Sequence, residues 1–274
     1  MLYGFSKILT KVFDVLVMPF GNERTLALAV LSLLTGVALI FLFKWTSDQK
    51  KIKDTRDKFK ARILEMRIYQ NDIVLIHKAL FAALWTNLVY LRVSLKPIVV
   101  LLLFVFGIFV QFDERYGRGH LEASDHALLS VTLKDGNDPK NVDFDLETGD
   151  GLVVDSRPVR SSATRQIFWR IVANKPGTHD LDVRVGGFDY RMPVRAEKTN
   201  GVIGHTRTAG SFFDPLLFPS LPEIPAESPL KAVSLQYPPT EYELFGWGTH
   251  WLVVFIIFSF VGALIPKFVF KIEI

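Results

Sequence analysis

Three apolar stretches dominate the pattern of hydrophobic and polar positions along the chain. They are Thr25–Phe43 with nineteen residues, Pro97–Phe112 with sixteen, and Phe245–Ile265 with twenty-one, the last interrupted only by His250. An apolar helix of about 20 residues, rising about 1.5 Å per residue, crosses a hydrocarbon core of about 30 Å. The pattern therefore predicts three transmembrane helices, over residues 22–44, 96–112 and 244–266.

The first twenty-one residues show a weaker, helical pattern. Lys7, Lys11 and Asp14 interrupt any signal-peptide core, and no small-x-small cleavage site follows them. The apolar positions fall near a period of 3.6: Leu2, Phe5, Leu9, Val12, Phe13, Leu16 and Phe20. We expect residues 1–21 to form an interfacial amphipathic helix along the membrane, ended by Pro19-Phe20-Gly21. A fourth, irregular span is the alternative.

Residues 45–95 predict a coiled-coil hairpin of two helices. The first is charge-dense with one narrow apolar seam at Ile52, Phe59, Ile63 and Met66. Turn-forming residues follow, and Asp72 is placed to cap a second helix. That helix carries apolar residues at Ile73, Ile76, Leu80, Leu84, Leu88 and Leu91. Pro97 is expected to kink or restart the helix where it enters the membrane, because proline removes one backbone hydrogen bond.

After Asp113 the hydrophobic period changes from 3.6 to 2. The alternating segments are 129–133, 142–146, 152–154, 166–172, 181–185 and 188–192, and Gly186-Gly187 is a two-residue hairpin signal. Short strands at this spacing predict an all-β, immunoglobulin-like sandwich over residues 113–207. Residues 208–243 are expected to be an unpacked Pro-rich strap that docks on an apolar surface. The residues expected to dock are Phe212, Phe213, Leu216, Leu217 and Phe218.

Composition and charge extend this prediction to topology. A hydrophobic content of 49% concentrated in runs indicates an integral membrane protein. Lys44 to Lys96 holds 12 Lys/Arg against 5 Asp/Glu, whereas Asp113 to Glu243 holds 15 against 20. Basic loops stay in the cytoplasm. We therefore expect an α-helical integral membrane protein of a bacterial inner membrane, with a cytoplasmic hairpin, an extracytoplasmic β domain and a cytoplasmic tail at 267–274.

The chain shows few groups that could carry chemistry. It has no Cys, and its scattered His residues lack metal-ligand spacing, so no metal site or other cofactor is expected. His250, between Trp247 and Trp251, is expected to lie in an interfacial aromatic belt. No catalytic motif is present, which argues against an enzyme. DNA is not an expected partner, because acids interleave with the basic residues of the hairpin.

Arg92 is the polar residue of greatest interest near the spans, together with Asn87 on the same predicted helix. Polar groups in lipid are costly and usually face a protein interior or a watery cavity. One interpretation places Arg92 at the base of a cavity open to the cytoplasm. The other makes it an interfacial residue whose guanidinium reaches lipid phosphates.

Two segments carry a resemblance to a known family. Lys44-Trp-Thr-Ser-Asp-Gln-Lys-Lys51 leaves the first span, and Asn87-Leu-Val-Tyr-Leu-Arg-Val-Ser-Leu-Lys-Pro97 enters the second. With the order of spans and hairpin, they resemble the Oxa/YidC insertase superfamily. The branch that looks most similar contains the third subunit of the ER membrane complex, the TMCO family and their prokaryotic relatives. The likeness covers residues 22–112 and 245–270.

The resemblance implies an insertase-like biogenesis factor with a polar intramembrane groove open to the cytoplasm. By placement, Arg92, Asn87, Ser32 and Thr35 would line that substrate groove. The implied partners are membrane lipid, nascent membrane proteins or other membrane subunits, and the ribosome at the basic hairpin. The alternative is a non-catalytic anchor or scaffold subunit of a larger envelope complex that binds partners through its external β domain.

Overall fold

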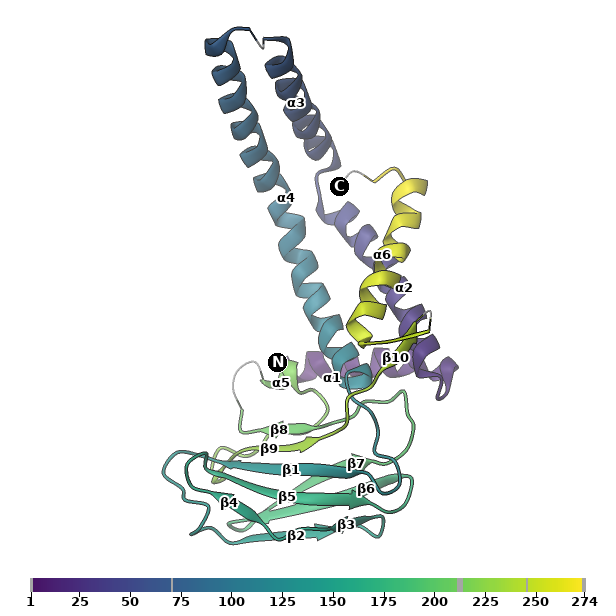
Figure 1. Cartoon of the computed structure of the whole chain (residues 1–274), viewed down its shortest axis with the longest axis vertical. Helices are drawn as coiled ribbons and strands as arrows, with labels where there is room; N and C mark the ends of the chain where they lie inside the picture. The colour runs from purple at the N-terminus through teal and green to yellow at the C-terminus, as the bar shows by residue number, and fades with distance from the viewer. Residues whose placement is uncertain (1, 70, 211–213, 245, 273–274) are drawn as a thin grey trace. The chain divides into compact units, whose positions relative to one another are not determined.

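The computed structural model describes residues 2–69, 71–210, 214–244 and 246–272. The chain divides into two compact units. One unit contains the residues up to Leu28 together with Gly107–Val253, and the other contains Ala29–Phe106 together with the residues from Val254 onward. The β domain belongs to the first unit and the helical hairpin to the second (Figure 1).

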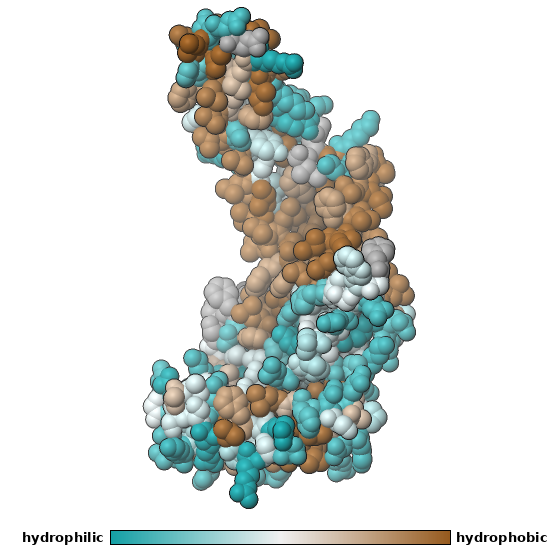
Figure 2. Space-filling view, in the orientation of Figure 1, coloured by the Kyte–Doolittle hydropathy of each residue, from teal (hydrophilic) through white to brown (hydrophobic). Residues whose placement is uncertain are grey.

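Within the described residues, three helices are long and apolar enough to cross a membrane. They are α2 (Arg24–Thr46), α4 (Ile73–Tyr116) and α6 (Trp251–Val269). This confirms the three predicted apolar helices. Helix α4 continues through Pro97 without a break, so of the two expected outcomes, a kink or a restart of the helix, the restart is wrong. Hydrophobic residues gather over these helices, whereas the visible face of the β domain is mostly hydrophilic (Figure 2).

Helix α3 (Gln49–Ile68) and the first half of α4 form the hairpin. Each helix begins at an aspartate, as the N-cap preference of short acceptor side chains predicts. Asp48 Oδ1 accepts from Lys51 N at 3.1 Å, and Asp72 Oδ1 accepts from Val74 N at 2.9 Å. Of the predicted seam, Ile52 is fully buried beside Tyr90 and Val93, but Ile63 is 44% exposed. The seam is thus fully buried at Ile52 and only partly buried further along α3, at Phe59 and Met66.

Helices α2 and α6 meet at two glycines. A Cβ atom added at Gly36 would lie 2.7 Å from the carbonyl carbon of Ser259, and one added at Gly262 would lie 2.9 Å from the carbonyl carbon of Leu33. Both neighbours are main-chain atoms. Small residues allow this close backbone approach between apolar helices.

The β domain consists of two antiparallel sheets packed face to face. The first has the order β3-β5-β1-β9-β8 with β4 paired to β5, and the second has the order β2-β6-β7. Inward residues of both sheets form one core, which includes Leu129, Ile167, Val183 and Val233. The strands are β1 (His126–Leu133), β2 (Phe144–Thr148), β3 (Leu152–Val154), β4 (Val159–Ser161), β5 (Gln166–Ala173), β6 (Thr178–Val185), β7 (Phe188–Arg195), β8 (Thr206–Thr208) and β9 (Leu230–Gln236).

The strand predictions succeed where turns are marked by glycine and fail where proline obscures them. Gly186 and Gly187 have φ values of +55° and +83° and join β6 to β7, as the hairpin signal predicts. The region 208–243 is not an unpacked strap, because β9 pairs with both β1 and β8. The prolines lie outside the strand, and Leu230, Val233 and Leu235 bury their side chains in the core.

The remaining elements surround the C-terminal end of α4. Helix α1 (Leu2–Val17) continues into a 3₁₀ turn at Met18–Phe20, and the short helix α5 (Asp214–Leu217) contacts α1. The predicted docking residues Phe212 and Phe213 lie outside the described residues. A small ribbon of β10 (Tyr242–Leu244) and β11 (Trp247–Thr249) precedes α6. The β domain starts and ends at one point, where Gly119 N donates to Pro238 O at 2.8 Å.

Candidate functional site

The hairpin half of α4 has an unusual distribution of side chains. Its buried positions are occupied by small residues, Ala79, Ala83 and Ser94. Its exposed positions carry large apolar residues at spacings of three and four, which places them on one face of the helix. We call this face the α4 ridge; it consists of the apolar residues Ile73, Val74, Phe81, Leu84, Trp85, Leu88, Leu91 and Leu95 together with the polar residues His77 and Arg92.

The α4 ridge is long and strongly exposed. Phe81 is 71% exposed and Trp85 is 69% exposed. From Ile73 to Leu95 the ridge extends roughly 33 Å at the standard helical rise. An apolar surface of this length on a protein marks contact with another protein or with lipid.

Arg92 lies in the α4 ridge, four residues after Leu88 and three before Leu95. Its side chain is exposed and makes no hydrogen bond or ion pair with another described residue. Asn87 is exposed as well, but five residues of helix separate it from Arg92, so the two side chains point in different directions.

The structure places the other two predicted groove residues differently. Ser32 is fully buried and Thr35 is 7% exposed on α2. Thr35 Oγ1 donates to Leu31 O at 2.8 Å, so the hydroxyl bonds to its own helix. Ser32 lies one turn before Gly36, on the face of α2 that meets α6. The four predicted residues therefore form two separate pairs, one exposed on α4 and one buried on α2.

A hollow of about 640 Å³ does lie between α2 and α4. None of the four predicted residues lines it. Its lining consists of Ala38, Phe41, Leu42, Lys44, Trp45 and Phe104. Lys44 is its one charged residue, with Nζ 5.4 Å from the centroid of the Phe270 ring. Lys44 and Trp45 belong to the segment that carries the family resemblance, and that was the signal in the sequence that could have identified them.

Helix α1 has three different faces: one is buried, one lines a cavity and one is exposed. Ser6, Phe13 and Val17 are buried. On an adjacent face, Lys7, Lys11 and Asp14 line a cavity. The third face is apolar and exposed, with Ile8 at 65%, Val12 at 50% and Val15 at 69%. An exposed apolar face beside a charged face is the pattern of a helix that lies in a membrane interface.

Arg115, near the C-terminal end of α4, holds α1 in place. It is fully buried and forms an ion pair with Asp14. Its NH1 donates to Gln111 Oε1 at 2.7 Å and its NH2 donates to Thr10 O at 3.1 Å. Gln111 Nε2 donates in turn to Thr10 Oγ1 at 3.0 Å. A buried guanidinium is tolerated only when such partners replace its lost hydration.

Glu114, the neighbour of Arg115, binds residues of the β domain at the C-terminal end of α4. It is 1% exposed and accepts a hydrogen bond from Ser220 Oγ. His205 Nδ1 lies 3.3 Å from Glu114 Oε1, and Ile203 N donates to Glu114 O at 2.9 Å. Loops on both sides of β8 are thereby held against α4.

The C-terminal carbonyls of α4 are also satisfied by side chains. Arg24, at the start of α2, donates to Arg115 O at 2.6 Å and to Arg118 O at 2.7 Å. Tyr242 donates to Tyr116 O at 3.0 Å. Burial raises the pKa of Tyr242 to about 12, so this donor keeps its proton at physiological pH. A cation at a helix C-terminus is also favoured by the helix dipole.

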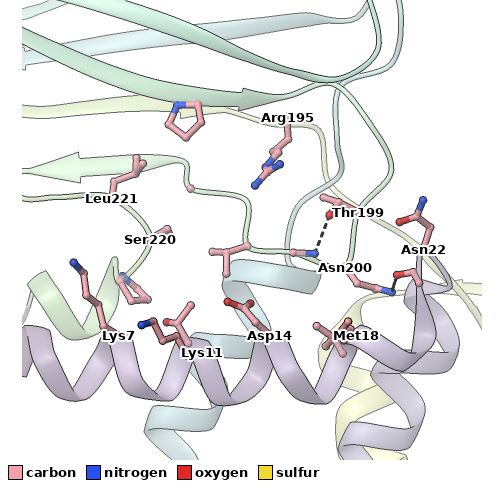
Figure 3. Close-up of a pocket in the computed structure, with 18 residues that line it drawn as sticks. Lys7, Lys11, Asp14, Met18, Asn22, Arg195, Thr199, Asn200, Ser220 and Leu221 are labelled. Atoms are coloured by element: carbon pink, nitrogen blue, oxygen red, sulfur yellow. Dashed lines mark hydrogen bonds between the residues drawn. The ribbon is translucent and has the colours of Figure 1, made fainter.

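The cavity beside α1 has a volume of about 730 Å³ and is lined by α1, by the loop 199–204 and by residues 219–221 (Figure 3). We call it the α1 cavity. Its charged lining residues are Lys7, Lys11, Arg195 and Asp14. Asn200 closes one side, where its Nδ2 donates to Gly21 O at 2.7 Å. No local sequence pattern predicts this cavity, because its walls come from distant segments; Gly21 and Asn200, for example, are 179 residues apart.

The histidines and the interfacial aromatic residues are distributed as follows. Among the described residues no group of three His, Cys, Asp or Glu side chains could hold a metal ion. Burial, followed by the nearby positive charge of Arg24, lowers the pKa of His120. Trp247 is 79% exposed, but Trp251 is 1% exposed and packs on Phe109 with a centroid distance of 5.0 Å. The expected aromatic belt therefore does not include Trp251.

Comparison of the chain with protein-family models, with curated proteins and with solved structures finds no match.

Proposed function

We propose that this protein is an insertase-like biogenesis factor, which receives apolar segments of nascent membrane proteins on the α4 ridge and releases them into the bilayer. The observation that carries the proposal is the ridge itself, an exposed apolar face about 33 Å long with Arg92 in it. That length matches an apolar segment able to cross a hydrocarbon core of about 30 Å.

The energetics of exposed apolar surface support this function. Removing apolar surface from water contributes about 25 cal/mol per Å², so large side chains such as Phe81 and Trp85 gain when an apolar segment covers them. Helix α4 buries the small residues Ala79 and Ala83 and leaves the larger apolar side chains exposed, where an arriving segment can cover them.

Arg92 gives the ridge a second property. A carboxylate or other polar group that enters lipid is costly unless a partner accompanies it. Arg92 has no partner of its own among the described residues, so its guanidinium is free to bind a polar group of the arriving segment. The hollow at Lys44 offers a second cation on the neighbouring helix.

The proposal includes a topology and a family. The basic hairpin would lie in the cytoplasm and the β domain outside it, in a bacterial inner membrane, with α1 on the outer surface. The resemblance to the Oxa/YidC superfamily supports the same assignment. The two packed antiparallel sheets are compatible with an immunoglobulin-like domain, which we include in the proposal.

Site-specific photocrosslinking tests the proposed function. A photoreactive residue would replace Trp85 or Arg92 on the ridge, or Lys58, an exposed residue of α3, as a matched control. In translating membranes we expect crosslinks to nascent membrane proteins at Trp85 and Arg92 and few at Lys58. Crosslinks only to phospholipid at Arg92 would favour the interfacial role, and the insertase proposal would then be wrong.

Two further measurements separate the alternatives. The chain has no Cys, so single cysteines at Tyr69 and Lys175 report sidedness directly. The proposal requires labelling of Tyr69→Cys from the cytoplasm and of Lys175→Cys from outside. Stoichiometric co-purification of a partner that depends on residues 120–200, without nascent-chain crosslinks, would instead indicate a scaffold subunit.

A further inference from the structure

The α1 cavity combines a positive lining with a fixed geometry. Lys7 and Lys11 lie one turn apart on α1, and Arg195 projects from the end of β7 toward the same space (Figure 3). The one carboxylate in the lining, Asp14, is already paired with the buried Arg115. The lining therefore holds three cationic side chains and one carboxylate.

Arg195 is held in position by residues of the β domain. Its NH1 donates to Thr178 Oγ1 at 2.6 Å and lies 4.0 Å from Glu197 Oε1. The guanidinium has five donor hydrogens, so these contacts leave donors available for an anion. Arg and Lys together are the residue types that bind phosphate groups.

The exposed apolar face of α1 indicates where such an anion would come from. A helix of this type places its apolar face about 5–10 Å into the boundary between headgroups and acyl chains. With Ile8, Val12 and Val15 in that position, the adjacent Lys7 and Lys11 would lie at the depth of the lipid phosphates. The volume of about 730 Å³ is within the range of small-molecule sites, roughly 300–1,000 Å³.

We propose that the α1 cavity binds a phosphate-bearing anion, and that its source is the headgroup of an anionic phospholipid such as phosphatidylglycerol. Lys11 and Arg195 would contact the phosphate, and the acyl chains would leave along the apolar face of α1. The inference rests on α1 lying in the membrane interface. It does not depend on insertase activity, because the cavity and the α4 ridge belong to different units.

Native mass spectrometry of the full chain, delipidated in detergent and then titrated with short-chain lipids, tests this. The three probes are phosphatidylglycerol, phosphatidylcholine and inorganic phosphate. We expect retention of phosphatidylglycerol over phosphatidylcholine, and no competition by inorganic phosphate at equal concentration. Competition by inorganic phosphate at equal concentration would show that the site takes a free anion, and the lipid source would be wrong.

Variants identify the site. Lys11→Gln and Arg195→Gln should each weaken phosphatidylglycerol binding about tenfold, because each removes hydrogen bonds to a charged group. Lys175→Gln and Lys231→Gln remove the same charge from exposed positions of the same unit and should leave binding unchanged. Unchanged binding in both cavity variants would overturn the proposal.

A variant that fills the cavity tests lipid binding independently if a charge variant fails to fold. Val202 lines the cavity and is only partly buried, so Val202→Trp fills space without altering charge. It should abolish phosphatidylglycerol binding while the crosslinks of the α4 ridge persist. Retained lipid binding in a folded Val202→Trp variant would place the lipid elsewhere on the protein.

Discussion

Replacement of Gly36 or Gly262 by alanine is the most direct test of the helical unit. Each glycine lies where α2 and α6 approach most closely. The added Cβ would lie 2.7 Å from the carbonyl carbon of Ser259 in Gly36→Ala, and 2.9 Å from that of Leu33 in Gly262→Ala. Main-chain atoms of a helix cannot rotate away, so the helices must separate.

The size of the effect follows from these distances. Ordinary contact requires 3.4 Å or more, and the carbonyl oxygens of Ser259 and Leu33 lie even closer to the added Cβ atoms than the carbonyl carbons do, so the helices must move apart by more than the shortfall at the carbons alone. Overpacking typically costs about 1–3 kcal/mol, and this overlap with main-chain atoms places the expected cost at the upper end of that range or above it. For a chain of this size, each kcal/mol lowers Tm by about 2–4 °C.

Gly107→Ala provides a matched control with the opposite expectation. Gly107 lies inside α4, and its added Cβ would meet only Leu9 Cδ2 at 3.4 Å, an acceptable contact. Alanine is favoured over glycine in a helix interior by up to about 1 kcal/mol. Thermal unfolding in detergent, followed by circular dichroism, should show a lower Tm for Gly36→Ala and an unchanged or higher Tm for Gly107→Ala. Equal Tm values for the two variants would refute the close crossing.

Three further predictions concern the other contacts. Arg115→Met should lower the free energy of unfolding by about 2–3 kcal/mol, since it removes hydrogen bonds to a buried charge. It should also speed hydrogen exchange in α1. Unchanged exchange would contradict the role of Arg115 in holding α1 against α4. Because the pKa of His120 is lowered from 6.5, its contribution to stability is complete above about pH 6.5 and is lost as the pH falls through the lowered value. The free energy of unfolding of the His120→Gln variant should depend less on pH in that range. The control variant His126→Gln, changed at an exposed position, should show the same pH dependence as the parent chain. Asp72→Ala should cost about 1 kcal/mol and increase hydrogen exchange only in the first turn of α4.

Local signals in the sequence predicted much of the fold. Period-2 alternation located most strands of the β domain, and glycine and aspartate marked the Gly186-Gly187 hairpin and the start of α4 at Asp72. These features depend on residues close together in the chain. The missed strand β9 shows the limit of composition, because prolines that flank Leu230–Gln236 were counted as if they interrupted it.

The candidate sites were harder to predict, because they depend on which face of a helix is covered. Ser32 and Thr35 are polar residues in an apolar helix, and the sequence does not reveal that they are buried. The position of Arg92 on an exposed face likewise follows only from the structure. Arg115 and Asp14 are 101 residues apart, and no spacing rule connects them.

The hydrogen bond between Gly119 and Pro238 makes the β domain a closed insertion. Because its first and last residues adjoin, evolution or an engineer could remove or exchange residues 120–237 by joining two neighbouring points of the backbone. The path from α4 to α6 would then need only a short loop. The β domain is thus separable from the helices that carry it.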